Sequence, residues 1–184
     1  MLLDNKKNGK VGDALKENLH AGAKLSVISG LFSIYGYESL KKELNQIENV
    51  RLLFSKLEIS DEGGFNFQSL NGDSFERRYK NRLNQATIAK ECANWLAKKA
   101  DIKVVSNPHI LNQNLFHIQN QDSPSIAIQG SSHFTTSGLG ISDSNKYDMN
   151  MLLSETSSTK DLLDWFNEIW ENPAAVNNIK ECLL

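Results

Sequence analysis

Hydrophobic and polar residues follow two different periods along the chain, and the alternation between them predicts an α/β fold. Apolar residues three and four positions apart predict an amphipathic helix, whereas a short apolar run predicts a strand buried in a sheet. By the first criterion we expect helices over residues 13–23, 37–47, 74–100, 159–171 and 174–183. By the second we expect strands over residues 24–30, 50–55, 102–106, 115–119, 125–130 and 149–154.

The order of the early elements predicts how they connect. Strand 24–30, helix 37–47 and strand 50–55 form a β-α-β unit, which places two parallel strands on a right-handed crossover. The run Val-Arg-Leu-Leu-Phe-Ser at 50–55 lacks polar alternation, so this strand should be central and buried on both faces. We therefore expect one domain over residues 1–184, with a mixed, mostly parallel central sheet of about six or seven strands and helices on both faces. The glycine-containing residues 56–73 predict a mobile loop.

Composition narrows the choice of function only slightly. The net charge of −2 gives no overall signature of nucleic-acid binding, although a local basic patch is compatible with it. No apolar run approaches the ~20 residues of a membrane span, and the first residues lack the apolar core of a signal peptide. Cys92 and Cys182 are far apart and fit no metal-ligand spacing. These features predict a cytoplasmic protein with reduced thiols and no structural metal.

The segment 115–139 carries the candidate chemistry. We expect His117 to be exposed on the strand 115–119, and a buried strand then leads into the loop Gly130-Ser131-Ser132-His133-Phe134-Thr135. Small residues allow backbone N–H groups to approach an anion, and hydroxyl groups add hydrogen-bond donors. The pattern therefore predicts a phosphate site, with Ser131, Ser132 and Thr135 as the phosphate-binding residues.

This order of residues resembles one half-site of the phospholipase D superfamily, and the resemblance covers nearly the whole chain. That family has His-x-Lys on a strand, a buried strand, Gly-Ser-x-Asn, Gly-Leu and then Asn-x-Glu. The corresponding residues here are His117, Ile126-Ala127-Ile128, Gly130-Ser131-Ser132-His133, Gly138-Leu139 and Asp148. The first half of the chain looks like the stand-alone phospholipase D-like nuclease domains found ahead of superfamily 2 helicases and in restriction enzymes. The resemblance thus implies that the chain is the N-terminal part of a longer helicase or restriction protein.

The resemblance also implies a reaction, which is hydrolysis of DNA phosphodiesters without a metal or other cofactor. One histidine attacks the phosphorus, and a second histidine from another subunit protonates the leaving oxygen. Because the chain has one motif, it should form a homodimer in which His117 plays both roles. The residues Gln119, His133 and Asp148 would complete the catalytic set.

Three of these positions depart from the family pattern, which leaves two interpretations open. Gln119 replaces a lysine, His133 replaces an asparagine and Asp148 replaces a glutamate. In the first interpretation the domain is an active nuclease, and His133 donates to the phosphate. In the second the site is degenerate, and the domain serves DNA binding or dimerisation for a neighbouring helicase. A lipid phosphodiesterase is disfavoured because the sequence contains no amphipathic membrane-binding stretch.

The densest basic cluster is Phe-Glu-Arg-Arg-Tyr-Lys-Asn-Arg. Its charged members are Arg77, Arg78, Lys80 and Arg82. The cluster favours a solvated helix face, and the alternative is a set of salt-dependent contacts to DNA phosphates that carry no sequence specificity.

Overall fold

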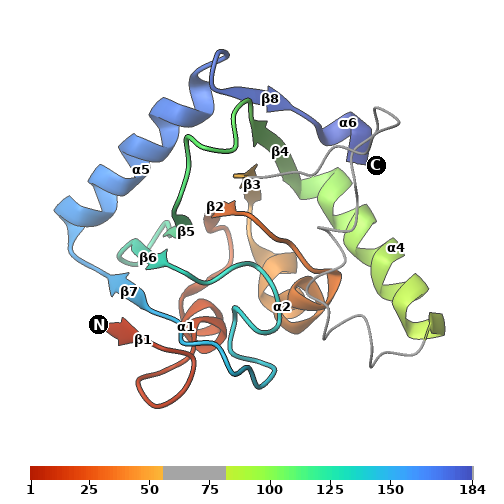
Figure 1. The fold of residues 1–184 in the computed structure, drawn as a ribbon, viewed down its shortest axis with the longest axis horizontal. Helices are drawn as coiled ribbons and strands as arrows, with labels where there is room; N and C mark the ends of the chain where they lie inside the picture. Colours follow the sequence, from red (N-terminus) through yellow and green to blue (C-terminus); the bar gives the residue numbers. More distant parts are fainter. Residues whose placement is uncertain (56–81, 184) are drawn as a thin grey trace.

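The computed structural model describes residues 1–55 and 82–183, in which one mixed sheet is flanked by helices (Figure 1). The strands are β1 (Leu2–Leu3), β2 (Lys24–Ser29), β3 (Asn49–Phe54), β4 (Ala100–Val105), β5 (Asn114–Gln119), β6 (Ile126–Gly130), β7 (Asn150–Leu153) and β8 (Val176–Asn178). The helices are α1 (Val11–Asn18), α2 (Ile34–Gln46), α4 (Arg82–Lys99), α5 (Thr156–Glu171) and α6 (Lys180–Leu183). The eight strands lie in the order β1-β7-β6-β5-β2-β3-β4-β8.

The α/β class is confirmed, but the expectation of a mostly parallel sheet is wrong. Only the pairs β2–β3 and β3–β4 are parallel. The pairs β1–β7, β2–β5, β4–β8, β5–β6 and β6–β7 are antiparallel. A parallel pair needs a long crossover, whereas antiparallel neighbours can follow one another through short connections. The predicted β-α-β unit is β2-α2-β3, and the second half of the chain adds its strands in the antiparallel manner.

The sheet also has more strands than the pattern predicted. The two strands that the sequence did not reveal are β1 and β8, of 2 and 3 residues. Segments this short cannot display a hydrophobic period, so only their pairing partners identify them. The prediction of a helix over residues 174–183 is therefore partly wrong. Within that range β8 (Val176–Asn178) pairs with β4, and only α6 (Lys180–Leu183) is helical.

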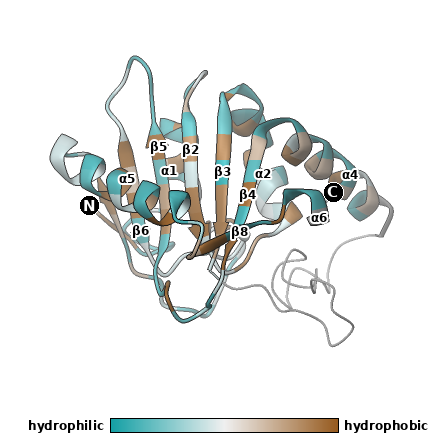
Figure 2. Cartoon of the chain, turned by 90° about the horizontal axis from the view of Figure 1, so that it is seen from above, coloured by the Kyte–Doolittle hydropathy of each residue, from teal (hydrophilic) through white to brown (hydrophobic). Residues whose placement is uncertain are grey.

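Helices cover both faces of the sheet, as predicted. Side chains alternate along each strand, so Val27 and Ile28 of β2 belong to two different core clusters. The larger cluster lies between the sheet and α1, α2 and α4, and it includes Leu15, Leu40, Trp95 and Phe116. The smaller cluster lies between the sheet and α5, and it includes Leu115, Ala127, Phe166 and Trp170. Figure 2 shows the hydrophobic residues of the central strands in brown.

Helix α1 begins two residues earlier than the pattern predicted. Its N-cap is Lys10, and Asp13, the first residue of the predicted helix, lies in the first turn. The side-chain oxygen of Asn5 accepts a hydrogen bond from Val11 N at 2.9 Å, which satisfies a donor at the start of the helix. The described part of the predicted helix 74–100 is α4, which ends at Lys99. The expected loop at 56–73 lies outside the described residues. Among the helices that are described, none has the length and apolar character needed to cross a membrane.

Candidate functional site

A cavity of about 450 Å³ lies beside the loop that follows β6, and we call it the His133 cavity. The loop leaves the carboxyl end of β6, next to the segment that follows β2 and the segment that precedes β7. The cavity is lined by Leu31, Ser131, His133, Thr135, Ser137, Gly138, Asn145, Lys146, Tyr147 and Asp148. An imidazole, an amine, a carboxylate and several hydroxyl groups therefore face one small space.

Three asparagine side chains hold this loop in place. Asn150 Oδ1 accepts from Ser132 N at 3.0 Å, and its Nδ2 donates to Ser132 Oγ at 2.8 Å. Asn114 Nδ2 donates to Ser131 O at 3.0 Å. Asn5 Nδ2 lies 3.1 Å from Ser132 Oγ and 2.9 Å from Asp148 Oδ2. Sequence reasoning missed all three, although a short amide side chain at the very start of a strand, as in Asn114 and Asn150, is a signal that could have found two of them.

The loop does not offer its backbone donors to an anion in the way the sequence suggested. The backbone N–H groups of Ser131, Ser132, Phe134 and Thr135 donate within the protein, to Met149 O, Asn150 Oδ1, Ser29 Oγ and His133 O respectively. Ser132 is buried, and its Oγ lies within hydrogen-bonding distance of two asparagines. Ser132 therefore fixes the loop, whereas Ser131 and Thr135 line the cavity and remain predicted phosphate contacts.

His133 is half-buried in the wall of the cavity. Its Nδ1 lies 3.5 Å from Ser29 Oγ, and in the described part of the chain Nε2 has no hydrogen-bond partner. Burial lowers the pKa of His133 below the usual histidine value; nearby Lys146 lowers it further, while Asp148 acts in the opposite direction. At neutral pH the ring is therefore uncharged, with one nitrogen able to donate and the other able to accept.

The carboxylate of Asp148 is fixed by donors on both of its oxygens. Oδ2 accepts from Asn5 Nδ2 at 2.9 Å, and Oδ1 accepts from Ser131 Oγ at 3.2 Å. Gly138 also lines this side of the cavity. A residue with a side chain would not fit there, because its Cβ atom would stand 2.2 Å from the carbonyl oxygen of His133. Asp148, one of the predicted catalytic residues, is therefore held by the loop after β6 and by Asn5.

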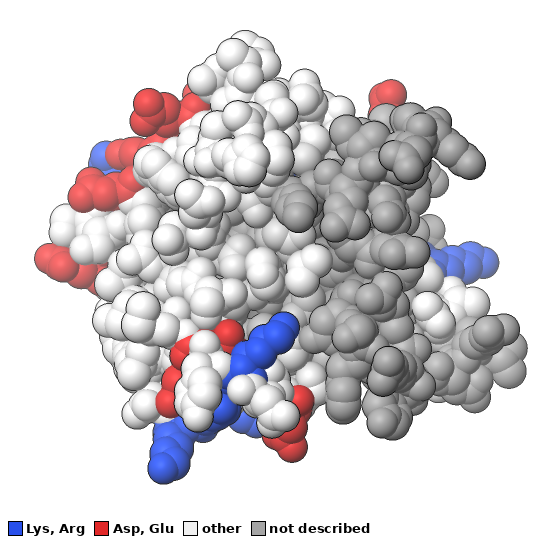
Figure 3. All heavy atoms as spheres, viewed as in Figure 1, with Lys and Arg blue, Asp and Glu red and all other residues white. Residues whose placement is uncertain are grey.

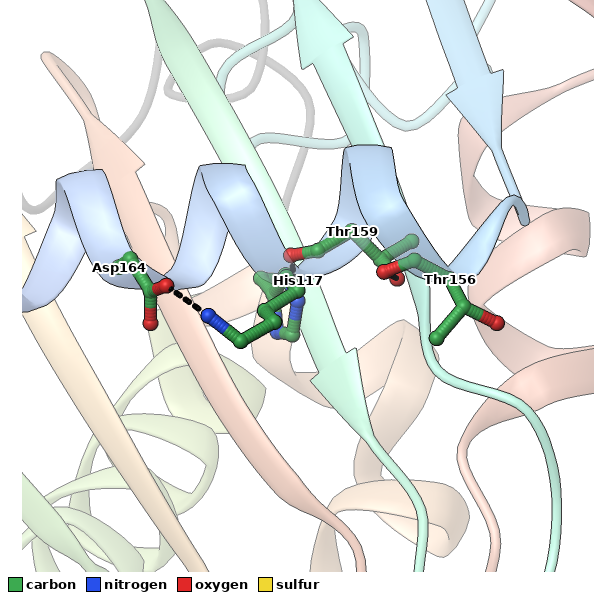
Figure 4. Close-up of polar contacts among 5 residues, drawn as sticks. His117, Thr156, Thr159 and Asp164 are labelled. Atoms are coloured by element: carbon green, nitrogen blue, oxygen red, sulfur yellow. Dashed lines mark hydrogen bonds and ion pairs between the residues drawn. The ribbon is translucent and has the colours of Figure 1, made fainter.

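His117 is buried, so the expectation of an exposed histidine is wrong. It is 1% exposed in the middle of β5, where it pairs with Ser26 and Ala127. Figure 4 shows the ring beneath the first turns of α5, where Nε2 donates to the carbonyl oxygen of Thr159 at 2.9 Å. Nδ1 is buried and has no partner among the described residues. Burial also lowers the pKa of His117, which keeps the ring neutral.

The four predicted catalytic residues consequently fall into two separate cavities. His133 and Asp148 line the His133 cavity. His117 and Gln119 line a second cavity of about 320 Å³ under the start of α5, together with Pro124, Ser125, Thr156, Thr159, Lys160 and Leu163. The ammonium group of Lys160 is paired with Asp164, as drawn in Figure 4. The structure does not bring the four residues together as a single catalytic set.

The basic residues that the sequence predicted as DNA contacts cannot be placed around either cavity. Arg77, Arg78 and Lys80 lie outside the described residues, and of Arg82 only its backbone position at the start of α4 is described. Within residues 1–55 and 82–183, no group of three or more histidine, cysteine, aspartate or glutamate side chains could hold a metal ion.

No protein-family model matches this chain, and no characterised protein matches it in sequence. Solved structures with a similar arrangement include NucT from Helicobacter pylori, at 14% identity and a TM-score of 0.49, covering 90% of this chain and 89% of that one. They also include TrmBL2, an archaeal chromatin protein whose structure shows a mode of DNA binding, at 11% identity and a TM-score of 0.47. That match covers 93% of this chain and 51% of TrmBL2, so this chain spans about half of its length. Neither similarity by itself assigns an activity to this chain.

Proposed function

We propose that this domain binds nucleic acid by holding a phosphate group of the strand in the His133 cavity. The observation that carries the proposal is the set of donors around this cavity. Lys146 supplies a positive charge, His133 supplies a ring N–H, and Thr135 supplies a hydroxyl group; the hydroxyl of Ser131 donates to Asp148 Oδ1 and would have to turn to contact a phosphate. Such contacts fix a phosphate without reading the bases.

The charges in the cavity are compatible with an anion. Lys146 forms no ion pair with any described residue, so its charge is available to a ligand. The one carboxylate in the lining, Asp148, has both oxygens within reach of donors from Asn5 and Ser131. Because these donors offset part of its charge, Asp148 repels a phosphate less than a free carboxylate would.

The proposal is tested by measuring the affinity of the purified chain for a fluorescent oligonucleotide at several salt concentrations. We expect Lys146→Ala to weaken binding roughly fivefold at about 0.1 M salt and to reduce the salt slope by about 1. Lys42→Ala is the matched control, since Lys42 is an exposed lysine of α2, which contributes no residue to the cavity. A wild-type chain that binds no oligonucleotide at low salt would overturn the proposal.

Hydrolysis of the bound phosphodiester is a second candidate, favoured by the position of His133. In the neutral tautomer that carries its proton on Nδ1, Nε2 is unprotonated and has no partner among the described residues, which is the form needed to attack phosphorus or to accept a proton. Catalysis through His117, the family role, would require the start of α5 to move away from β5, because Thr159 O holds its Nε2.

Turnover of a chromogenic phosphodiester in the presence of EDTA separates these roles. Loss of turnover in His133→Ala, with turnover retained in His117→Ala, would assign hydrolysis to the His133 cavity. The reverse result would restore the family role of His117, and no turnover in the wild type would leave binding alone.

The homodimer and the attachment to a helicase or restriction protein remain proposals from the resemblance. Sedimentation that shows only monomer at micromolar concentration would contradict the shared-site dimer.

A further inference from the structure

A tyrosine side chain at the edge of the His133 cavity is almost completely exposed. Tyr147 is 94% exposed and lines the cavity next to Lys146. The ammonium group of Lys6, on the loop after β1, lies 4.4 Å from the centroid of the Tyr147 ring. Such an amphipathic ring normally buries much of its apolar surface, so an exposed one beside a polar cavity needs an explanation. With Lys6 over one face of the ring, the other face remains open to solvent.

Two segments far apart in the sequence carry exposed lysines on this side of the molecule. Lys6, Lys7 and Lys10 are exposed on the segment between β1 and α1, and Lys146 is exposed on the segment before β7. Figure 3 shows lysines gathered with a few carboxylates at the lower edge of the molecule, where these two segments lie. We call Lys6, Lys7, Lys10, Lys146 and Tyr147 the Tyr147 patch.

Two carboxylates near the Tyr147 patch, those of Asp4 and Asp148, are engaged in local hydrogen bonds. Asp4 Oδ1 accepts from the backbone N–H groups of Lys6 and Asn8, each at 2.9 Å, and Oδ2 accepts from Asn8 Nδ2. Asp148 is fixed by Asn5 and Ser131, as described above. The two segments carry four lysines, Lys6, Lys7, Lys10 and Lys146, against three aspartates, Asp4, Asp143 and Asp148, so their net charge is +1, which favours an anionic ligand along this surface.

From these observations we infer that the domain binds single-stranded nucleic acid, with one base stacked on Tyr147 and the phosphate of the same or a neighbouring nucleotide in the His133 cavity. The inference rests on the proposed function and adds the strandedness of the ligand. A flat aromatic surface beside a basic groove suits an unpaired base, since every base has a stacking face. In a duplex the bases are stacked on one another inside the helix and cannot lie on Tyr147.

The inference is tested by comparing the affinities of a single-stranded oligothymidine and a hairpin duplex of equal charge. We expect the single strand to bind more tightly, and Tyr147→Ala to weaken its binding by about 5- to 150-fold, the range for loss of one stacked base. Tyr147→Phe should keep near wild-type affinity, because it retains the ring. Duplex binding should be insensitive to both substitutions.

Trp165→Ala provides the matched control for removing an exposed aromatic side chain, since Trp165 is 39% exposed on α5 and is absent from the cavity lining. Its affinity should equal that of the wild type. Equal or tighter binding of the duplex, or unchanged single-strand binding by Tyr147→Ala, would overturn the inference and leave the proposed phosphate site standing. Failure of the wild type to bind either oligonucleotide would overturn both.

Discussion

Replacing Asn5 with alanine is expected to destabilise the protein strongly, because this side chain joins the segments around the His133 cavity. Asn5 Nδ2 lies within hydrogen-bonding distance of Ser132 Oγ, Gly138 O and Asp148 Oδ2. Its Oδ1 accepts from Val11 N. One side chain thus connects the loop after β1, the start of α1, the loop after β6 and the segment before β7.

The expected cost follows from these contacts and from the backbone conformation. The two amide hydrogens of Asn5 can satisfy two of the three acceptors fully, and Oδ1 adds one further bond, which gives about 3 kcal/mol at ~1 kcal/mol per bond. Asn5 has a φ of 59°, where alanine is strained and asparagine is tolerated, which adds about 1 kcal/mol. The total of about 4 kcal/mol is a large part of the 5–15 kcal/mol that holds a typical domain folded.

Urea unfolding at pH 7, followed by circular dichroism, measures this cost as a shift in the transition midpoint. Asn5→Gly separates the two contributions, because glycine removes the hydrogen bonds but accepts the positive φ. We expect the glycine variant to be about 1 kcal/mol more stable than the alanine variant. An alanine variant within about 0.5 kcal/mol of the wild type would show that Asn5 does not hold these segments together.

Three further predictions concern the two core clusters and the buried histidines. Because the folded state lowers the pKa values of His117 and His133, folding favours their neutral forms; stability should be complete above the ordinary histidine pKa of 6.5 and fall as the pH drops below it. Urea midpoints between pH 8 and pH 5 check this, and a His117→Gln variant with an unchanged pH slope would contradict the part assigned to His117. Phe166→Ala should lower the free energy of unfolding by about 3–5 kcal/mol, since the buried ring stacks on Trp170 at 5.5 Å and has the Arg51 guanidinium 4.6 Å from its centroid. Thermal unfolding measures this loss, and Trp165→Ala, which removes an exposed ring from the same helix, is the control. Cys92 is buried and its pKa is raised to about 12, so in a Cys182→Ser background the thiol should react with a disulfide reagent only after denaturation; rapid labelling of the folded protein would refute its burial.

The sequence predicted the parts of the fold that depend on one segment at a time. The β-α-β unit and the helices on both faces follow from local periodicity, which tells a strand from a helix without reference to other segments. The direction of β5, β6 and β7 depends on which strand each one joins, and periodicity carries no such information. Residues 1–5 show the same limit, because β1 and the contacts of Asn5 with Ser132 and Asp148 exist only through partners more than 125 positions away.

The candidate site was predicted in part for the same reason. Ser131, His133, Thr135 and Asp148 do line one cavity, because they belong to two segments that flank paired strands. His117 was misplaced because its alternation with Phe116 and Ile118 shows only that it faces the other side of the sheet. Helix α5 covers that side of the sheet. Its contact residue, Thr159, lies 42 positions from His117 in the sequence, so local alternation around His117 cannot reveal it. Tyr147 carries no motif, and only the cavity reveals it.

The long sequence separation between the partners that Asn5 and Asn150 join has a consequence for the order of folding. Asn5 reaches across 143 positions to Asp148, and Asn150 reaches across 147 positions to Leu3. Contacts so distant in sequence carry a large loop-closure entropy, which must be overcome before the bonds form. We therefore expect the β2-α2-β3 unit to form early and the walls of the His133 cavity to close last. During synthesis on a ribosome, the growing chain would hold most of its sheet before it could bind any ligand.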